Sequence, residues 1–515
     1  MKKTLLAVAM AGLVLLPMPV ASAAEPVQLV SINRAGTATG SALSYDGSSA
    51  ASYGGFGSLN TSRPVTSRDG RFVVFSSLAT DLVSTPTSGQ ANVFRRDTVT
   101  GTTTQVSVSR SGRAGNAASS GGYLSADGRY VIFQSSATDL VAGSAQPAAT
   151  GVFIRDVQTG VTSAVSVSPV GVFANAPAYV NAISGNGRYV VFGTSATNLQ
   201  PGCTRGKPGL YVRDTVARTT TVVNVDDTGT NCGNDGAYGA TQISDDGRYV
   251  SFVSDSTDLV GGDRNAQTDV FVRDRRQART ILVSVNTAGE SSDGGGSQPS
   301  MSGNGRLIVF LGCGSDLVGN DHNDACDIFV RDIVDGQTQL ASVDRAGTQS
   351  GNNPFDPISQ QFLGGSFQPA ISLNGRYVAF TSGSTNLVAG DTNKETDLFV
   401  RDRQTGTTTL VRGSDYDPGY LPLFSGSGRF LLFTGLFTRD LHVRDQQSGD
   451  LRLVNAAKPG STGASSPPNG ARISRDGSTV VFTSLATNLV ATPDTNPPPY
   501  AGAPSAADVF LASTG

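Results

Sequence analysis

One repeated pattern constrains the fold of this chain more than any other feature. Eight times along the sequence, a serine is followed three residues later by a glycine and five residues after that by a phenylalanine. The glycines are Gly70, Gly128, Gly187, Gly247, Gly305, Gly375, Gly428 and Gly477, with spacings of 58, 59, 60, 58, 70, 53 and 49 residues. A period of this size is typical of propellers and solenoids.

Each unit divides into four short segments that predict β-strands. Strand A is a short run such as Ala240–Ile243, and an Asp-Gly or Asn-Gly hairpin turn follows because glycine reaches positive φ without steric cost. Strand B, such as Tyr249–Phe252, is apolar on both faces, as in a sheet packed between two others. Strand C, such as Val270–Asp274, and strand D, such as Gln105–Val108, complete the unit. Eight such units predict an all-β, eight-bladed β-propeller of four-stranded antiparallel blades.

The two ends of the chain predict how the ring closes. Residues 27–32 (V-Q-L-V-S-I) resemble a D strand but have no A, B or C strand before them. The eighth unit ends at strand C, with Val509–Leu511, and has no D strand after it. We therefore expect the N-terminal strand to complete the last blade, which would leave no open sheet edge at the join.

Residues 1–23 have the layout of a secretory signal peptide. A positive start is followed by an apolar run from Leu5 to Val20 and by small residues ending at Ala23. We expect residues 24–515 to form the exported mature protein, a single propeller domain in the periplasm or outside the cell. No other stretch is long and apolar enough to span a membrane, so we expect no membrane span after cleavage of the signal.

The composition limits the partners. Charged residues make up only 15% of the chain, the net charge is −3, and no basic patch is present, which argues against nucleic acid. A closed ring needs no second copy to cover an edge, and we expect a monomer.

The four cysteines are an even number in a chain expected to be exported, which predicts two disulfides. Because strand direction alternates, the A–B and C–D turns share one face of the ring (the turn face), and the B–C and D–A loops share the other (the long-loop face). Cys203 and Cys232 lie in neighbouring loops of the long-loop face, and Cys313 and Cys326 bracket one B–C loop. Pairing within each neighbourhood is the simplest arrangement, and free thiols are the alternative.

The motifs S-x-D-G-R-x-V-x-F and V-F-V-R-D resemble the TolB-like propeller repeat of the bacterial cell envelope, over essentially the whole mature chain. The resemblance implies a propeller without the N-terminal α/β domain of TolB. In the first four units the proline that usually precedes Asp-Gly is replaced by Arg68, Ala126, Gly185 and Asp245. Because one fold supports many functions, the resemblance predicts the fold only.

Residues that recur in nearly every unit are interpreted as scaffold. They include the arginine after the glycine and the Arg-Asp pair that ends strand C, for which turn capping and ion pairs between blades are the expected roles. The chain has two histidines, His322 and His442, and the second occupies a position where other units carry Phe or Tyr. No nucleophile elbow, zinc-binding or phosphate-binding motif is present, so Ser-His or Cys-His catalysis is disfavoured.

Three consecutive B–C loops carry a D-x-N-x-x-x-D pattern. The residues are Asp263, Asn265 and Asp269, then Asp321, Asn323 and Asp327, then Asp391, Asn393 and Asp397. Alternating oxygen side chains suit a hard cation such as Ca²⁺, the only cofactor that the sequence suggests. Asp and Asn also cap turns without any metal, and both interpretations remain open.

Long D–A loops at residues 33–63, 226–239 and 344–366 distinguish the long-loop face from the turn face. Loops on a rigid scaffold commonly carry binding residues, and aromatic residues such as Tyr45, Phe355 and Phe367 are present here. We therefore expect an exported, non-enzymatic propeller that binds a protein or another envelope or extracellular ligand through this face. The alternative is a carboxylate-dependent polysaccharide lyase or glycoside hydrolase, which would need a cluster of Asp, Arg or His from particular blades at the central channel.

Overall fold

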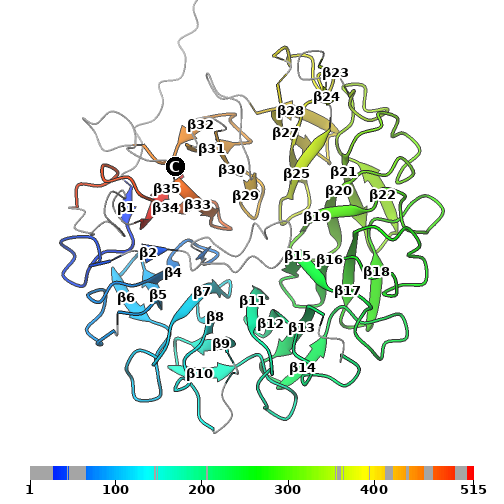
Figure 1. Cartoon of the computed structure of the whole chain (residues 1–515). Helices are drawn as coiled ribbons and strands as arrows, with labels where there is room; N and C mark the ends of the chain where they lie inside the picture. Colours follow the sequence, from blue (N-terminus) through cyan, green and yellow to red (C-terminus); the bar gives the residue numbers. More distant parts are fainter. Residues whose placement is uncertain are drawn as a thin grey trace, which may run out of the picture.

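The computed structural model describes residues 27–42, 44–45, 65–87, 89–143, 147, 149–203, 207–353, 355–356, 361–362, 365–393, 395–411, 422–435, 440–456, 468–492 and 507–514. Within these residues the chain contains strands and no helix, so none long and apolar enough to cross a membrane is found there. Eight antiparallel sheets follow one another around a ring (Figure 1). The predicted eight-bladed propeller is confirmed, whereas the predicted signal peptide lies outside the described residues.

The innermost strands vary most in length between blades, from two to seven residues, and the outermost strands are short, with two to four residues. The innermost strands, A, are β2 (Ser44–Tyr45) with β3 (Val65–Thr66), β7 (Ser119–Leu124), β11 (Ala178–Ile183), β15 (Ala237–Ile243), β19 (Gly296–Met301), β25 (Ser366–Ile371), β29 (Leu423–Phe424) and β33 (Pro468–Ile473). The outermost strands, D, are β6 (Thr102–Gln105), β10 (Val161–Ala164), β14 (Thr219–Val222), β18 (Arg279–Leu282), β22 (Gln337–Leu340), β28 (Thr407–Leu410), β32 (Leu451–Leu453) and β1 (Gln28–Leu29). A separate hairpin, β23 (Phe355–Asp356) and β24 (Gln361–Phe362), precedes the sixth blade.

The two middle strands of each blade form the core. Strands B are β4 (Phe72–Ser77), β8 (Tyr130–Ser135), β12 (Tyr189–Thr194), β16 (Tyr249–Ser254), β20 (Leu307–Gly312), β26 (Tyr377–Ser382), β30 (Phe430–Thr434) and β34 (Thr479–Ser484). Strands C are β5 (Asn92–Asp97), β9 (Gly151–Asp156), β13 (Gly209–Asp214), β17 (Asp269–Asp274), β21 (Asp327–Asp332), β27 (Asp397–Asp402), β31 (Leu441–Asp445) and β35 (Asp508–Ser513). A buried aromatic ring from B stacks on one from C, as Phe75 does on Phe94 at 5.8 Å between ring centroids. Burying one such side chain stabilises the fold by about 1.5–3 kcal/mol.

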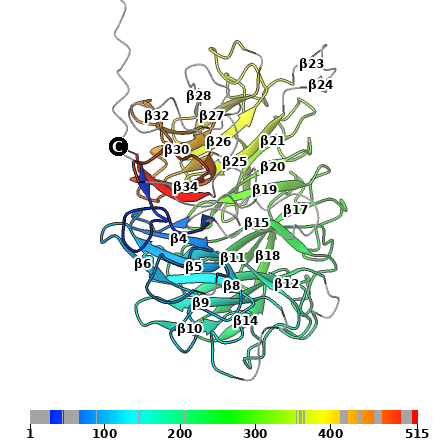
Figure 2. The ribbon, with the colours of Figure 1, turned by 60° about the vertical axis from the view of Figure 1, so that its left-hand side comes forward.

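The N-terminal strand closes the ring as predicted. Strand β1 pairs antiparallel with β35, with Gln28 opposite Leu511 and Leu29 opposite Phe510. The Ser31 hydroxyl donates to Asp508 Oδ1 at 2.6 Å and accepts from the Val509 amide at 3.0 Å. In Figures 1 and 2 the blue N-terminal strand lies beside the red C-terminal strands.

The expected position of strand D was wrong by about three residues. This strand of blade 1 was expected at Gln105–Val108, whereas β6 spans Thr102–Gln105. The reason is the serine at position 107, whose hydroxyl accepts the Val93 amide hydrogen at 3.0 Å in place of a backbone carbonyl. The regular backbone pairing of strand D therefore ends at Gln105, before this serine.

Strand A of blade 1 is interrupted, which corrects the predicted loop at residues 33–63. Strand β2 pairs with β4 through Ser44 and Ser77, and β3 pairs with the same strand through Val65 and Val74. In blade 2 the corresponding place holds only a bulge, between Ser120 and Tyr123. Part of the predicted loop, Ser44–Tyr45, therefore belongs to an innermost strand, and the rest of it from residue 46 to 63 lies outside the described residues.

Candidate functional site

The arginine and aspartate that recur in seven of the eight blades are structural. The Arg71 guanidinium pairs with Asp97 at 2.6 Å, and Asp97 Oδ1 also accepts the Val99 amide hydrogen at 3.0 Å, which caps the C–D turn. Hydrogen bonding to Arg71 lowers the pKa of Asp97 to about 2. Equivalent pairs join Arg129 to Asp156, Arg188 to Asp214, Arg248 to Asp274, Arg306 to Asp332, Arg376 to Asp402 and Arg429 to Asp445. Turn capping was predicted correctly, but these ion pairs lie within blades, not between them.

His442 is a packing residue, as its position in strand C suggested. Its ring stacks on Phe433 at 5.6 Å between centroids, the arrangement that Phe–Phe pairs have in other blades. Burial lowers the pKa of His442. Catalysis by this histidine therefore has no support in the geometry.

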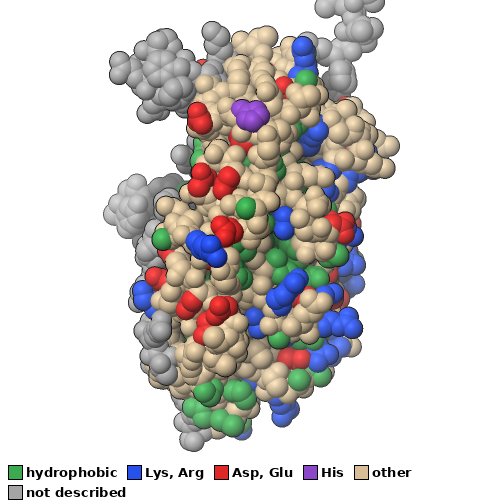
Figure 3. Space-filling model, turned by 90° about the vertical axis from the view of Figure 1, so that its right-hand side faces the viewer, with side chains coloured by type: hydrophobic (Ala, Val, Ile, Leu, Met, Phe, Trp, Pro, Cys, Tyr) green, Lys and Arg blue, Asp and Glu red, His purple; other side chains and the backbone are tan. Residues whose placement is uncertain are grey.

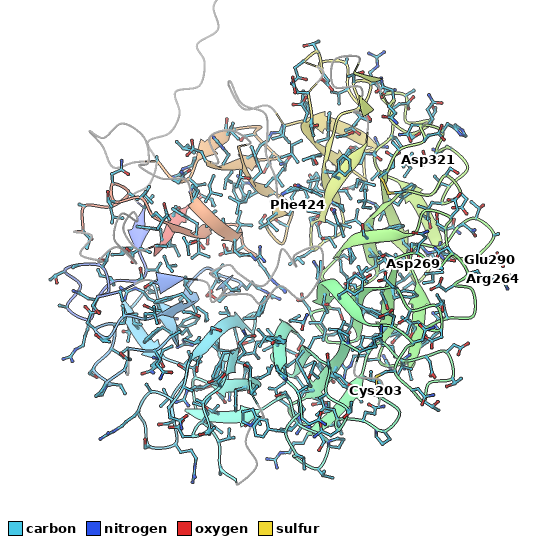
Figure 4. All side chains as sticks on the ribbon, viewed as in Figure 1. Cys203, Arg264, Asp269, Glu290, Asp321 and Phe424 are labelled. Atoms are coloured by element: carbon cyan, nitrogen blue, oxygen red, sulfur yellow. A yellow bond between two sulfur atoms is a disulfide. The ribbon has the colours of Figure 1, made fainter. Side chains whose placement is uncertain are left out.

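The three acidic loops each bury their two aspartates. In blade 4, Asp263 and Asp269 are both buried, and Asp269 lies inward of the loop edge that carries Arg264 and Glu290 (Figure 4). Neither Asp263 oxygen makes a hydrogen bond of ordinary geometry, and Asp269 Oδ2 makes none either. Burial raises the pKa of the Asp263 carboxyl, and this effect outweighs the opposite effects of the Ser291 hydroxyl and the Asn265 backbone amide.

Blades 5 and 6 repeat this arrangement with one difference. Asp321 and Asp327 are buried in blade 5, and Asp391 and Asp397 are buried in blade 6. In blade 5 the Asn323 amide donates to Asp327 Oδ2 at 2.7 Å, and the Ser342 hydroxyl donates to Asp327 Oδ1 at 2.5 Å. Both oxygens of Asp327 are thus hydrogen-bonded, whereas Asp269 accepts a hydrogen bond of ordinary geometry only at Oδ1, from the Ser284 hydroxyl at 2.5 Å.

The asparagine of each motif caps a turn. Asn265 Oδ1 accepts the Gln267 amide hydrogen at 2.9 Å, and Asn323 and Asn393 accept from the residue two positions later in the same way. This is the turn-capping role considered from the sequence, and it uses one of the two lone pairs on each oxygen. Within the described residues, no three Asp, Glu, His or Cys side chains gather in a way that could hold a metal.

Burial makes these carboxyl groups hard to ionise. It raises the pKa of Asp269 to about 7 and that of Asp327 to about 7, because a charge is poorly solvated there. The charge of Asp263 raises the pKa of Asp269 further, and Asp321 does the same for Asp327. The loops of blades 4 and 5 therefore each hold two adjacent carboxyl groups whose pKa values are raised.

Both predicted disulfides are present, and both tie loops of the long-loop face. Cys203 is joined to Cys232, which links a B–C loop to the following D–A loop. Cys313 is joined to Cys326 across one B–C loop. The described part of the chain contains no free cysteine.

Three aromatic side chains are exposed at the same level of the innermost strands. Tyr179, Tyr238 and Phe367 expose 37%, 36% and 41% of their surface, and each is the second residue of its strand A. Blades 2 and 5 carry Ser120 and Ser297 at this level. Because strand A begins at the D–A loop, this aromatic level lies at the long-loop end of the ring axis.

The aromatic level and the acidic loops meet at blade 4. The Tyr238 hydroxyl lies 3.4 Å from Thr268 Oγ1, and Thr268 donates to Asp255 Oδ1 at 2.6 Å. Thr268 belongs to the loop that carries Asp263 and precedes Asp269 directly. On the rim shown in Figure 3, acidic side chains gather toward the left-hand edge and Lys and Arg toward the right-hand edge. The long-loop face thus combines exposed aromatic rings with acidic loops.

At the other end of the axis the structure brings together charges that the sequence analysis did not connect. Arg475 Nη1 donates to Asp245 Oδ1 at 2.5 Å, and Arg68 Nη2 lies 3.9 Å from Asp245 Oδ2. In the sequence, Arg68 and Asp245 stood out only as residues that replace the usual proline of the repeat, which does not show that they meet.

No protein-family model and no curated protein sequence matches this chain. Among solved structures, an oligogalacturonate lyase in complex with manganese is 12% identical, with 93% of this chain and 98% of that one covered and a TM-score of 0.42. A prolyl endopeptidase is also 12% identical, with 83% of this chain covered and a TM-score of 0.45, and the match spans 55% of that protein. TolB from Acinetobacter baumannii is 12% identical, with 75% and 82% covered and a TM-score of 0.30.

These likenesses are of propeller fold alone, and no activity follows from them. The fold and its join define the class of the molecule: an eight-bladed β-propeller closed by its own N-terminal strand, with TolB among its structural neighbours.

Proposed function

We propose that this chain is an exported, non-enzymatic propeller that binds a protein or another envelope or extracellular ligand through its long-loop face. The observation that carries the proposal is the exposed aromatic level formed by Tyr179, Tyr238 and Phe367. Large aromatic side chains dominate the energetics of recognition surfaces, because they bury much area at a low entropic cost. The signal-like N-terminus and the two disulfides support export.

The geometry also supports a preformed binding surface. The three aromatic residues stand on strands of a closed ring, so their backbones do not have to be ordered when a ligand arrives. The Cys203–Cys232 bridge restrains two loops of the same face close to blades 3 and 4. Binding energy is then available for the contact itself.

Ca²⁺ is the cation that we propose for the acidic loops. It would be held by Asp263 with Asp269, by Asp321 with Asp327, and by Asp391 with Asp397, with the remaining lone pairs of Asn265, Asn323 and Asn393 as further oxygen donors. The support comes from blade 4, where buried carboxylate oxygens lack hydrogen bonds of ordinary geometry. Two carboxylates per ion correspond to weak extracellular sites, with dissociation constants of about 0.1–1 mM.

A capture experiment with matched variants tests the binding proposal. The mature protein would be immobilised and exposed to envelope and culture-medium fractions of its own source. The triple variant Tyr179→Ser, Tyr238→Ser, Phe367→Ser should lose the captured ligand. The control replaces three exposed valines in C–D turns of the opposite face, Val99, Val216 and Val334, by serine and should retain it. If both variants capture the ligand equally, the aromatic level is not the binding surface.

The axial cluster of Arg68, Asp245 and Arg475 favours one second candidate, a polysaccharide lyase. It is a cluster contributed by particular blades at the central axis, the feature expected of an enzyme. Hydrolysis by a carboxylate pair is not supported, because the cluster holds a single carboxylate and that mechanism needs two. An assay for unsaturated products from acidic polysaccharides, with Arg68→Gln as the comparison, tests the lyase.

A further inference from the structure

Eight residues surround the turn-face end of the ring axis, one from each A–B turn. They are Arg68, Ala126, Gly185, Asp245, Gly303, Leu373, Gly426 and Arg475. Backbone hydrogen bonds of 2.7–2.9 Å join successive turns, for example from the Arg68 amide to the Ala126 carbonyl and from the Gly303 amide to the Leu373 carbonyl. The Asp476 amide donates to the Arg68 carbonyl at 2.9 Å and joins the last blade to the first. These residues therefore frame one opening.

The Arg475 side chain reaches from blade 8 to the Asp245 carboxylate of blade 4. Asp245 belongs to blade 4 and Arg475 to blade 8, on the opposite side of the ring, yet their side chains meet at 2.5 Å. A Cβ atom at Gly185 would lie 2.9 Å from Asp245 Oδ1, and one at Gly303 would lie 3.4 Å from Oδ2. This carboxylate therefore lies between the turns of blades 3 and 5 and is joined to blade 8 through Arg475.

The innermost strands and the eight turn positions carry three arginines and one aspartate. These described residues are Arg68, Arg472, Arg475 and Asp245; the next residue of four turns is also an aspartate (Asp69, Asp127, Asp246 and Asp476), whose carboxylate accepts a backbone hydrogen bond within its own turn. Arg472 lies on β33, three residues before Arg475. A ring of weakly charged walls concentrates the field of such groups.

The Arg68 guanidinium has hydrogen-bond donors that no described residue accepts. Its guanidinium carries five N–H groups, but in the described part of the chain its side chain makes no hydrogen bond, and its one ion pair is the 3.9 Å contact with Asp245. The side chain exposes 59% of its surface. Arg475, by contrast, is held by the carboxylate that it contacts.

We propose that the turn-face end of the axis binds one compact anion, a carboxylate or a phosphate group, between Arg68 and Arg475. The planar guanidinium fork matches both groups, since each presents two oxygens to parallel N–H donors. Asp245 neutralises one arginine and leaves the other for the ligand. This site lies at the opposite end of the axis from the aromatic level, so it stands or falls independently of the proposed binding face.

Titration calorimetry on the mature protein tests the proposal. Inorganic phosphate and, separately, acetate would be titrated at equal ionic strength, and at least one should bind with one site per chain. The anion that binds more tightly identifies the ligand class. Arg68→Gln should weaken binding about tenfold, as expected for loss of a charge-assisted contact. Asp245→Asn should tighten it, because the competing carboxylate is removed.

Arg113→Gln is the matched control, since Arg113 is an exposed arginine in a D–A loop on the other face. It should leave the affinity unchanged. Arg68 is the decisive position, because its exposed side chain has no structural contact whose loss would unfold the ring. The proposal is overturned if neither anion binds, if Arg68→Gln binds as tightly as the parent protein, or if Arg113→Gln weakens binding equally.

Discussion

Removal of the N-terminal strand should destabilise the whole ring. Deleting residues 24–32 takes three buried apolar side chains, Val27, Leu29 and Val30, out of the last blade. At about 1.5–3 kcal/mol each, their burial contributes roughly 5–9 kcal/mol. The two hydrogen bonds of the Ser31 hydroxyl add about 1 kcal/mol each. Because domains are stable by only about 5–15 kcal/mol, the deletion removes much of the total.

The assay is thermal unfolding combined with size-exclusion chromatography. The truncated protein should melt well below the parent and aggregate, since β35 becomes an open edge. A peptide of residues 24–42, added in excess, should restore part of the loss. The milder variant Val30→Ala, in the same blade, should lower the free energy of unfolding by about 2 kcal/mol. Val99→Ala, at an exposed position, should lower it by less than about 0.5 kcal/mol. Closure by this strand is refuted if the truncated and the parent proteins melt alike.

The remaining predictions concern the long-loop face. Free Ca²⁺ at a hundredfold excess over its dissociation constant should stabilise the fold by about 2.7 kcal/mol for each loop that binds an ion. Replacing Asp269, Asp327 and Asp397 by Asn should abolish the calcium-dependent shift in melting temperature. The control Asp324→Asn, in the loop that carries Asp327, should keep the shift. If the protein melts at the same temperature with chelator and with calcium, these residues are turn caps only. In chelator, the free energy of unfolding should fall as the pH rises from about 4 to 7. The reason is that the pKa values of Asp269 and Asp327 are raised to about 7 in the folded state, so the folded chain binds more protons than the unfolded chain over that range. The raised pKa values are contradicted if calorimetry shows a free energy of unfolding that stays constant or rises between about pH 4 and 7, or if Asp269→Asn leaves this pH dependence unchanged. Replacing Cys313 and Cys326 by Ser should lower the free energy of unfolding by about 3 kcal/mol, measured by urea denaturation, and an unchanged midpoint would mean that the bridge adds no stability.

The blade could be predicted from sequence because its determinants are local. Each Asp-Gly or Asn-Gly turn fixes a hairpin, and the glycine is required at a place such as Gly128, which has φ of 71° and lies against Phe72. The eight-fold count and the unmatched N-terminal strand then define the closed ring. The end of strand D was missed because it depends on Ser107, a side chain that replaces a backbone acceptor across the sheet.

The sites were harder to predict because they depend on which residues meet across the ring. Asp245 and Arg475 are 230 residues apart in sequence and come from opposite blades, so no local pattern joins them. Tyr179, Tyr238 and Phe367 share a level only once the pairing with strand B is known. The acidic loops were visible as a motif, but the burial of both aspartates in each was not.

Hydrogen exchange measured by mass spectrometry tests the central claim most directly. The mature protein would be compared alone and in the presence of the fraction from which it captures its ligand. Binding through the long-loop face predicts slower exchange in peptides covering 178–183, 237–243 and 366–371, together with the loops at 263–269 and 321–327. Slower exchange confined to the A–B turns, around 67–71 and 244–248, would contradict the assignment of the binding face.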